Sequence, residues 1–582
     1  MRNEYPRPDF VRDSFVSLDK EWDFDFDDKN LGHKEKWFIN HKFTKAINVP
    51  FCFQSKLSGI NDKSFHDHIW YQTEIKVRTL KEDERVILYF LGVDYYSETY
   101  INGFRVKDNY GANVGFEIDI TDYLIDDKAK ITIYVNDPSE DRLIPRGKQD
   151  WEKESHTIFY TRTSGIYKPV YYQIVNKRHI KNFFYTTSLK DNSINLTLLN
   201  TNNDGYLKFK ITDKNDCSYE YIYNIHKYIE RFTINLPNDF VNDRIWRVEY
   251  PYLFNIELSL FDENMNLKDI VKSYLGFRDI SISNGKVYLN EHEIYQKLVL
   301  FQGYYEDGIL TPKSIDVMEN DIKMMKELGF NGCRIHQKTA DPYFLYLCDK
   351  LGFYVWQECA ANYGYSLLSP ERQINEWIKI IKFNYNHPSI IAYTPLNESW
   401  GVEGIPQDEK IKAHAMSLYY LIKSLDDSRL VISNDGWEHC KTDLLTIHNY
   451  SHGNKDEIEK YKKFEKTLSN RDEILKFEGI GRFIINPGFI DEGQPILLTE
   501  FGGVALNNKE NEKDWGYTTS KNEKEFIEDL KRIYKAIKES NCIVGYCYTQ
   551  FNDVEQEVNG LVTYDRKYKV NPKLIKEIND SI

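Results

Sequence analysis

The sequence has none of the features that mark a membrane protein or a disulfide-rich secreted domain. No apolar run among its 582 residues approaches the roughly 20 residues of a membrane-spanning helix. The first residues do not show the basic and then apolar pattern of a signal peptide. The eight cysteines are dispersed and none forms a Cys-x-x-Cys pair, which argues against a disulfide framework or a zinc knuckle. We therefore expect a soluble, cytoplasmic protein with no membrane partner.

The sequence also lacks an excess of positive charge. Its 76 Lys and Arg residues are outnumbered by 90 Asp and Glu residues, so the formal net charge is −14. A protein that binds nucleic acid through the phosphates is usually basic, and we therefore expect no nucleic-acid partner. Aromatic residues make up 15% of the chain. This content suits either a β-rich core or rings that stack on sugars.

The first half of the chain shows the alternation of apolar and polar residues that is typical of half-buried β-strands. Examples are residues 97–101, 131–135 and 207–211, and turn signals such as Asn102-Gly103 separate the runs. The pattern continues to about residue 275, which is too long for one sandwich of about 100 residues. We therefore predict two β-sandwiches, one over residues 1–175 and one over residues 176–275.

From residue 276 onward the apolar pattern changes. Residues at helical spacing, such as Ile315, Met318 and Ile322, alternate with short apolar runs. Eight runs lie at 297–302, 330–336, 353–358, 390–398, 430–434, 444–448, 495–500 and 543–548. Eight strands alternating with helices predict a (β/α)8 barrel, whose active site lies at the C-terminal ends of the strands. A doubly wound sheet is the alternative, but no GxGxxG or Walker motif follows any of these strands.

Polar residues follow almost every predicted strand of this barrel. They are Gln302, His336, Glu358, Asn397, Glu398, Asn434, Asp435, His448, Asn449, Tyr450, Glu500 and Gln550. Glu398 closes the fourth strand and Glu500 the seventh, so a barrel directs both toward one pocket. Two facing carboxylates can cleave a glycosidic bond, because one protonates the leaving oxygen and the other stabilises the oxocarbenium-like centre. The alternative for each is a carboxylate that caps the next helix.

The residues around both glutamates resemble known motifs. The stretch from Asn386-His387-Pro388 to Asn397-Glu398-Ser399-Trp400 resembles the acid/base signature of glycoside hydrolase family 2, the family of β-galactosidases, β-glucuronidases and β-mannosidases. Thr499-Glu500-Phe501-Gly502 resembles its nucleophile segment. Residues 92–103 and 165–170 resemble its sugar-binding jelly roll, and residues 246–254 the end of its immunoglobulin-like domain. The resemblance implies a jelly-roll sandwich (1–175), an immunoglobulin-like β-sandwich (176–275) and a catalytic (β/α)8 TIM barrel (276–582).

The resemblance implies a retaining double displacement in which Glu500 is the nucleophile and Glu398 the general acid/base. Their carboxyl groups should then lie about 5–5.5 Å apart. It further implies that Asn397 binds the sugar 2-hydroxyl and that Tyr450 contacts the nucleophile. Arg334 would keep Glu500 ionised, because a nearby cation lowers the pKa of a carboxyl group. Further candidates for the substrate pocket are Asp307, His336, Trp437, His448, Tyr548 and Gln550.

Some positions depart from the family pattern. Gln337 stands in place of a histidine, and Tyr393 and Tyr548 stand in place of tryptophans. We expect Tyr548 to replace the platform beneath the sugar. Residues 550–565 lack the Asn-x-Lys pair by which the family's glucuronidases bind a carboxylate, so a glucuronide is disfavoured. Cys359-Ala360 stands where the large β-galactosidases place metal ligands, and we expect no metal and no other cofactor.

We therefore predict a retaining exo-glycosidase that removes a terminal sugar from an oligosaccharide or glycoside, most simply a β-galactoside. Other β-glycosides and furanosides, including α-L-arabinofuranosides and β-galactofuranosides, stay open. Two further alternatives are a transglycosylase that uses the same glutamates and a carbohydrate-binding protein without catalysis. A homo-oligomer is expected from the resemblance alone.

Overall fold

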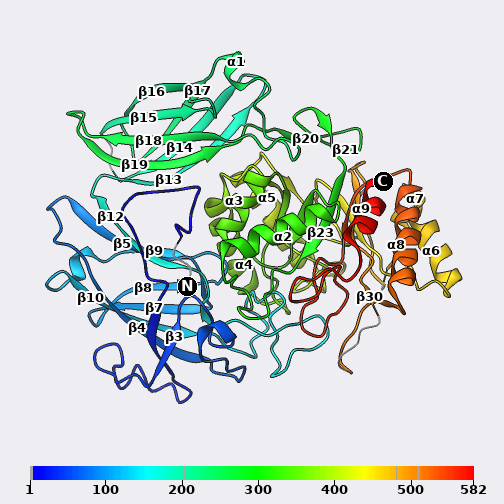
Figure 1. The fold of residues 1–582 in the computed structure, drawn as a ribbon, viewed down its shortest axis with the longest axis horizontal. Helices are drawn as coiled ribbons and strands as arrows, with labels where there is room; N and C mark the ends of the chain where they lie inside the picture. The colour runs from blue at the N-terminus through cyan, green and yellow to red at the C-terminus, as the bar shows by residue number, and fades with distance from the viewer. Residues whose placement is uncertain (1–3, 202–203, 480, 507–511) are drawn as a thin grey trace.

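A computed structural model describes residues 4–201, 204–479, 481–506 and 512–582 of the chain. It contains two β-sandwiches followed by a barrel of parallel strands, so the predicted fold is confirmed. In Figure 1 both sandwiches lie on the same side of the barrel. Within the described residues, no helix has both the length and the apolar character needed to cross a membrane.

The first sandwich is built from two antiparallel sheets. Their orders are β1-β12-β5-β9 and β3-β2-β4-β10-β7-β8. The strands are β1 (Phe15–Ser17), β2 (Glu21–Phe26), β3 (Lys45–Asn48), β4 (His68–Lys76), β5 (Glu84–Phe90), β7 (Tyr96–Ile101), β8 (Phe104–Tyr110), β9 (Phe116–Asp119), β10 (Lys128–Asn136) and β12 (Val170–Asn176). Short elements accompany them: η1 (Lys56–Ser58), η2 (Thr121–Tyr123), and the pair β6 (Val93–Asp94) and β11 (Gly165–Ile166). Alternating side chains such as Trp22, Phe24 and Ile133 fill the space between the sheets, as the period-two pattern requires.

A long loop of this sandwich, residues 137–164, packs onto the barrel. The backbone N–H groups of Arg146 and Gly147 donate to the carbonyl of Ala361 at 3.0 and 2.9 Å. At the other end of the loop, Gln556 donates from Nε2 to the carbonyl of Phe159 at 2.9 Å. The first domain therefore contributes directly to the surroundings of the barrel mouth.

The second sandwich has sheets of three and four strands, in the orders β13-β14-β17 and β16-β15-β18-β19. The strands are β13 (Ile180–Ser188), β14 (Ser193–Asn200), β15 (Gly205–Thr212), β16 (Ser218–Ile225), β17 (Ile229–Asn235), β18 (Phe254–Phe261) and β19 (Leu267–Leu275), with helix α1 (Asn238–Val241) before β18. A small sheet of β20 (Ile280–Ser283), β21 (Lys286–Leu289) and β22 (His292–Glu293) leads into the barrel. Trp246 is fully buried and donates from Nε1 to the carbonyl of Asp349 at 2.8 Å, which fixes this domain against the barrel.

The barrel strands follow one another in chain order around a parallel sheet, β27-β26-β25-β24-β23-β32-β29-β28. They are β23 (Gln296–Phe301), β24 (Gly332–Ile335), β25 (Tyr354–Glu358), β26 (Ile390–Thr394), β27 (Leu430–Val431), β28 (Leu445–His448), β29 (Ile496–Glu500) and β32 (Ile543–Tyr548). The helices are α2 (Ile315–Glu327), α3 (Pro342–Leu351), α4 (Ser369–Asn384), α5 (Glu409–Leu425), α6 (Ile458–Leu468), α7 (Arg471–Leu475), α8 (Glu523–Lys538) and α9 (Pro572–Asp580). The pair β30 (Val504–Leu506) and β31 (Thr518–Ser520) lies between β29 and α8.

The alternation along the barrel strands divides their side chains into two layers. Leu298, Trp356 and Leu497 belong to the cluster that fills the barrel interior. Val299 and Leu498 belong to the larger cluster that packs the strands against the helices. Since parallel strands carry their C-terminal ends to one edge, the residues that follow them meet at the mouth of the barrel.

Candidate active site

Glu398 and Glu500 lie opposite each other at the barrel mouth. Glu500 ends β29, whereas Glu398 follows β26 with its backbone at φ 52°, in the left-handed region that few residues other than glycine adopt. Such backbone is common where function requires it. A carboxylate oxygen of each glutamate and a ring nitrogen of His448 all lie within 4.8 Å of one another. This separation suits retaining glycosidases, whereas inverting enzymes leave about 6.5–9.5 Å between the carboxyl groups.

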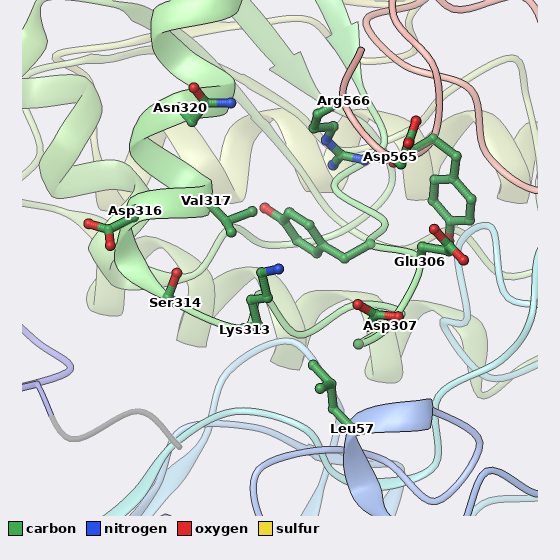
Figure 2. Close-up of a pocket in the computed structure, with 13 residues that line it drawn as sticks. Leu57, Glu306, Asp307, Lys313, Ser314, Asp316, Val317, Asn320, Asp565 and Arg566 are labelled. Carbon is green, nitrogen blue, oxygen red and sulfur yellow. Dashed lines mark hydrogen bonds between the residues drawn. The ribbon is translucent and has the colours of Figure 1, made fainter.

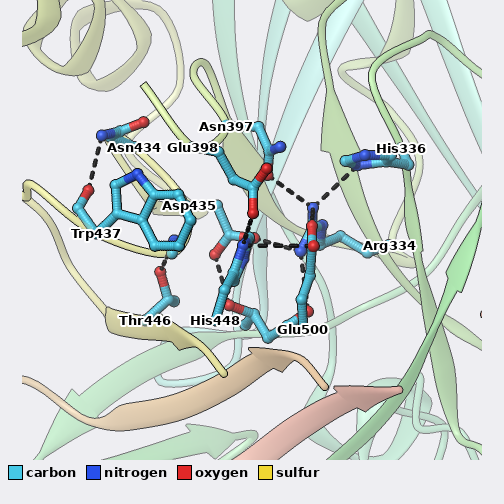
Figure 3. Close-up of polar contacts among 12 residues, drawn as sticks. Arg334, His336, Asn397, Glu398, Asn434, Asp435, Trp437, Thr446, His448 and Glu500 are labelled. Carbon is cyan, nitrogen blue, oxygen red and sulfur yellow. Dashed lines mark hydrogen bonds and ion pairs between the residues drawn. The ribbon is translucent and has the colours of Figure 1, made fainter. Parts of the chain in front are cut away.

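Arg334, from β24, contacts several buried charged side chains next to this pair of glutamates (Figure 3). Its Nη2 atom donates to Oε1 of Glu500 at 2.7 Å and to Oδ1 of Asn397 at 2.9 Å. The guanidinium also forms ion pairs with Glu358 and Asp435. Burial by itself would lower the pKa of Arg334, but the facing carboxylates raise it well above its ordinary value. Arg334 is therefore a permanent cation that orients the Glu500 carboxylate.

His448, at the end of β28, connects the two glutamates. Its Nδ1 atom lies 2.8 Å from Oε1 of Glu398 and 3.4 Å from Oε2 of Glu500. Its Nε2 atom lies 3.1 Å from Oδ2 of Asp435. Burial opposes the charged imidazole, but the charges of Glu500 and Asp435 and two hydrogen bonds raise the pKa of His448 to about 10. His448 is thus protonated at neutral pH and donates from both nitrogens.

The same contact affects Glu398. Burial would raise the pKa of Glu398, but the hydrogen bond and charge of His448, together with the charges of Lys148 and Arg334, lower it below its ordinary value. Trp400 donates from Nε1 to Oε2 of Glu398 at 3.3 Å. Glu398 is consequently ionised in the free protein.

Tyr450 supports Glu500 from the opposite side. Its hydroxyl donates to Oε2 of Glu500 at 2.7 Å and lies 2.9 Å from Oγ1 of Thr549. The ring stacks on Tyr517 with the centroids 3.5 Å apart. Glu500 therefore accepts hydrogen bonds from Arg334 and Tyr450 on different oxygens.

Some polar atoms in the site have no protein partner among the described residues. The Nδ2 atom of Asn397 and the Nε1 atom of Trp437 are buried without an acceptor. The Trp437 ring lies edge-on to His448, with centroids 5.5 Å apart. Burying an unpaired donor is costly, so these N–H groups fit contacts with a bound ligand.

The barrel, the carboxylate pair and its surroundings can be compared with known proteins. Residues 15–174 match the sugar binding domain of the glycosyl hydrolases family 2, and residues 280–582 match its TIM barrel domain. Residues 178–278, between them, match a further model described as glycosyl hydrolases family 2. The chain belongs to glycosyl hydrolases family 2. This confirms the resemblance seen in the sequence motifs.

Some similar family 2 proteins are named β-glucuronidase and others β-galactosidase. A β-glucuronidase of Streptococcus agalactiae is 23% identical, with 87% of this chain and 86% of that one covered. A β-galactosidase of Thermoanaerobacter pseudethanolicus is 26% identical over 66% of this chain and 50% of its own length. The chain spans only 63% of a putative β-glucuronidase of Formosa agariphila. A β-D-glucuronidase structure from Dictyoglomus thermophilum covers 100% of this chain and 99% of its own, with a TM-score of 0.78 at 19% identity.

Two of the predicted site residues lie elsewhere in this family 2 fold. Asp307 lies at a surface pocket of about 500 Å³ beside Leu57 and Lys313 (Figure 2), and its Oδ1 atom is 3.8 Å from Nζ of Lys56. Tyr548 is fully buried in the cluster between strands and helices, against Phe501. The structure does not support a site role for Asp307, because its carboxylate is about half exposed at this surface pocket. The assignment of Tyr548 was wrong because the alternation along β32 directs this side chain away from the barrel interior.

The remaining predicted residues surround the carboxylate pair. His336 is buried and lies 2.9 Å from Nη2 of Arg334, and burial, with the charges of Lys148 and Arg334, lowers the pKa of its imidazole well below the ordinary value. Gln550 is also buried, and it donates from Nε2 to Oδ1 of Asn559 at 2.8 Å.

Sequence reasoning assigned no site role to several residues that the structure brings close. These are Lys148 and Tyr160 from the first domain, Glu358 and Asp435 from strand ends, and Trp400, Tyr517, Glu557 and Asn559 from barrel loops. Glu358 and Asp435 were already noted as polar residues at strand ends, and this position was the signal for a site role. The loop residues had no such signal.

The cluster of Glu398, His448 and Glu500 has the composition of a metal site. A histidine nitrogen binds a metal through its lone pair, in the neutral form. The raised pKa of His448, about 10, keeps a proton on each ring nitrogen. In the metal-free protein the three side chains therefore form a carboxylate pair linked by a cationic histidine.

Proposed function

We propose that this family 2 glycosidase is a retaining exo-enzyme in which Glu500 is the nucleophile and Glu398 the general acid/base. The short separation of the two carboxylates is the observation that carries this proposal. The hydrogen bonds from Arg334 and Tyr450 support the assignment of Glu500, because they hold its carboxylate in one orientation. The contact with His448 supports the assignment of Glu398, because it places a proton donor beside it.

The reaction has two displacements. Glu500 attacks the anomeric carbon while the bond to the leaving oxygen breaks, and Glu398 delivers a proton to that oxygen. Since Glu398 is ionised in the free protein, its proton comes from His448 through their shared hydrogen bond once the substrate is bound. Water then bonds to the anomeric carbon, which releases Glu500, and gives a proton to Glu398, which passes it back to His448. Asn397 is placed to bind the sugar 2-hydroxyl through its unpartnered Nδ2 atom.

For the sugar we propose a neutral glycoside, with a β-galactoside as the first choice. Relatives named β-galactosidase and the missing Asn-x-Lys pair at 550–565 support this choice, although other relatives are named β-glucuronidase. Exo action is supported by the loop 137–164, because Phe159 and Tyr160 of this loop contact Gln556 and Glu557 of the barrel. Furanosides, transglycosylation, a catalytically silent binding protein and a homo-oligomer remain hypotheses.

A panel of nitrophenyl glycosides tests the proposal. It should contain β-galactoside, β-glucoside, β-mannoside, β-glucuronide, α-L-arabinofuranoside and β-galactofuranoside. We expect one neutral glycoside to be hydrolysed and Glu500→Gln to lower its kcat by about 10⁴-fold or more. The matched control is Glu371→Gln on the exposed face of α4, which should keep full activity. Activity that survives in Glu500→Gln would contradict the assignment, and no hydrolysis of any glycoside would favour a binding protein.

A further inference from the structure

Lys148 is a buried cation without an ionic partner. It lies on the loop 137–164 of the first domain and is only 8% exposed. Within the described part of the chain, no carboxylate lies within 4.0 Å of its ammonium group, and no acceptor forms a hydrogen bond with it. The ammonium is not among the fully buried polar atoms that lack a partner, and Lys148 lines a cavity together with Arg146, His336 and Gln337. The ammonium is therefore free to donate to a ligand that enters this cavity.

The backbone around Lys148 is firmly held against the barrel. The carbonyl of Lys148 accepts from the N–H of Tyr160 at 2.8 Å. The preceding carbonyl, of Gly147, accepts from the Tyr363 hydroxyl at 2.7 Å. A Cβ on Gly147 would lie 2.3 Å from the carbonyl oxygen of Gln337, so this close approach requires glycine. The loop thus places Lys148 in the site with little freedom.

Glu557 is a second buried charge of the same region, and it comes from the barrel. It is 3% exposed, and its carboxylate accepts from the Tyr160 hydroxyl at 2.5 Å and from Nδ2 of Asn559 at 3.0 Å. Each oxygen has a further lone pair to offer. Burial raises the pKa of Glu557 above its ordinary value, although the charge of Lys148 and the hydrogen bonds from Tyr160 and Asn559 lower it, and the charge of Glu500 adds to the rise. The carboxylate therefore lies within the field of both Lys148 and the proposed nucleophile.

We propose that Lys148 and Glu557 are specificity-determining residues that together bind hydroxyl groups of the terminal sugar. This inference rests on the proposed function. A sugar hydroxyl can accept from the Lys148 ammonium and donate to the Glu557 carboxylate at once, which no apolar or purely acidic group can do. Lys148 comes from the first domain and Glu557 from the barrel, and a hydroxyl group of the bound sugar would link the two side chains.

The same pair selects against an acidic sugar. A uronate at this position gains an attraction to Lys148, but its carboxylate then faces Glu557, where two like charges repel. Glu557 cannot turn away, because Tyr160 and Asn559 hold both of its oxygens. We therefore assign the site to a neutral sugar, and preference for a uronide is the outcome that contradicts the assignment.

The test uses Lys148→Met, Glu557→Gln and the double variant, with the neutral nitrophenyl glycoside that the wild-type enzyme hydrolyses fastest. Each single change should lower kcat/KM by about 10- to 100-fold, because one charge-assisted hydrogen bond to the sugar is lost. The double variant should lose much less than the product of the two, because both residues act on the same hydroxyls. Lys153→Met, on an exposed part of the same loop, is the matched control and should behave as wild type.

The kcat/KM values of deoxy substrates distinguish direct binding of a sugar hydroxyl by Lys148 from a purely structural role of this residue. Among monodeoxy analogues of the substrate, one should lose about 10- to 100-fold in wild type and show little further loss in Lys148→Met. If Lys148→Met does not fold, Lys148→Arg, which keeps the positive charge, takes its place in the same comparison. Unchanged kcat/KM in Lys148→Met, with activity still lost in Glu500→Gln, would overturn this inference alone. Loss of all hydrolysis in the wild-type panel would overturn the proposed function as well.

Discussion

The Nδ1 atom of His448 lies 2.8 Å from Oε1 of Glu398. The same ring is held from behind by Asp435, whose Oδ2 atom lies 3.1 Å from Nε2. Both the charge and the orientation of the imidazole are therefore set before substrate binds. This arrangement gives the proposed acid/base a neighbouring proton donor.

The charge of His448 should make stability depend on pH. Its pKa is about 10 in the folded protein against 6.5 ordinarily, so its stabilisation is complete below pH 6.5 and is lost as pH rises through about 10. The free energy of unfolding should therefore fall over this interval in wild type, and less in His448→Gln. Urea unfolding at pH 6.5, 8 and 10 measures this, with exposed His226→Gln as the control. Parallel curves for wild type and His448→Gln would contradict it.

Replacing Asp435 by Asn should destabilise the protein strongly. Asp435 is fully buried, pairs with Arg334 and His448, and accepts from Oγ1 of Thr499 at 2.8 Å. Breaking a buried pair leaves charge uncompensated, at a cost of about 3–5 kcal/mol. Denaturant unfolding compares this variant with Glu319→Gln, which removes a surface pair with Lys323 and should cost less than about 1 kcal/mol. A loss of similar size in both variants would show that the buried network contributes little.

Glu398→Ala should affect glycosides according to their leaving group. An acidic nitrophenol leaves without protonation, so the glycosylation step should change little with it. A glycoside with a basic alcohol should lose about 10²- to 10⁴-fold in kcat/KM. A series of aryl and alkyl glycosides measures this dependence. Glu500→Gln is the contrasting variant, since it should lose activity with every leaving group, and equal losses in Glu398→Ala would argue against an acid role.

Tyr450→Phe should lower kcat with little change in the fold. The substitution removes the hydroxyl that donates to Glu500 at 2.7 Å but leaves the ring stacked on Tyr517. We expect a loss of about 10- to 100-fold in kcat, since the charge-assisted bond orients the nucleophile. Steady-state kinetics measures it, with Tyr110→Phe on an exposed tyrosine as the control. Full activity would show that Arg334 alone positions Glu500.

Much of the site was predictable because its signals are local in the chain. Glu398 and Glu500 stand at the ends of apolar runs, and parallel strands of a barrel bring such ends together whatever the details of packing. Arg334 followed from the family resemblance. The two sandwiches were predictable for a similar reason, since the period of two is a property of each strand. These conclusions needed only the order of residues along the chain.

Tyr548 shows where local pattern was insufficient. The neighbouring residue on β32, Cys547, belongs to the interior cluster, and Tyr548 belongs to the outer one. A strand reaches both layers in turn, and its register in the barrel decides which residues face inward. The position of Tyr548 in the family motif therefore could not show whether its side chain faces the barrel interior or the helices.

By itself, the sequence determined the family, the order of the three domains and the two glutamates, because each depends on neighbouring residues. Only the tertiary structure brought Lys148 and Tyr160 to Glu557, residues that come from different domains. Their meeting depends on how the loop 137–164 packs against the barrel through Ala361 and Gln556. Contacts between segments so distant in the chain depend on packing across the domain interface, which no local pattern encodes.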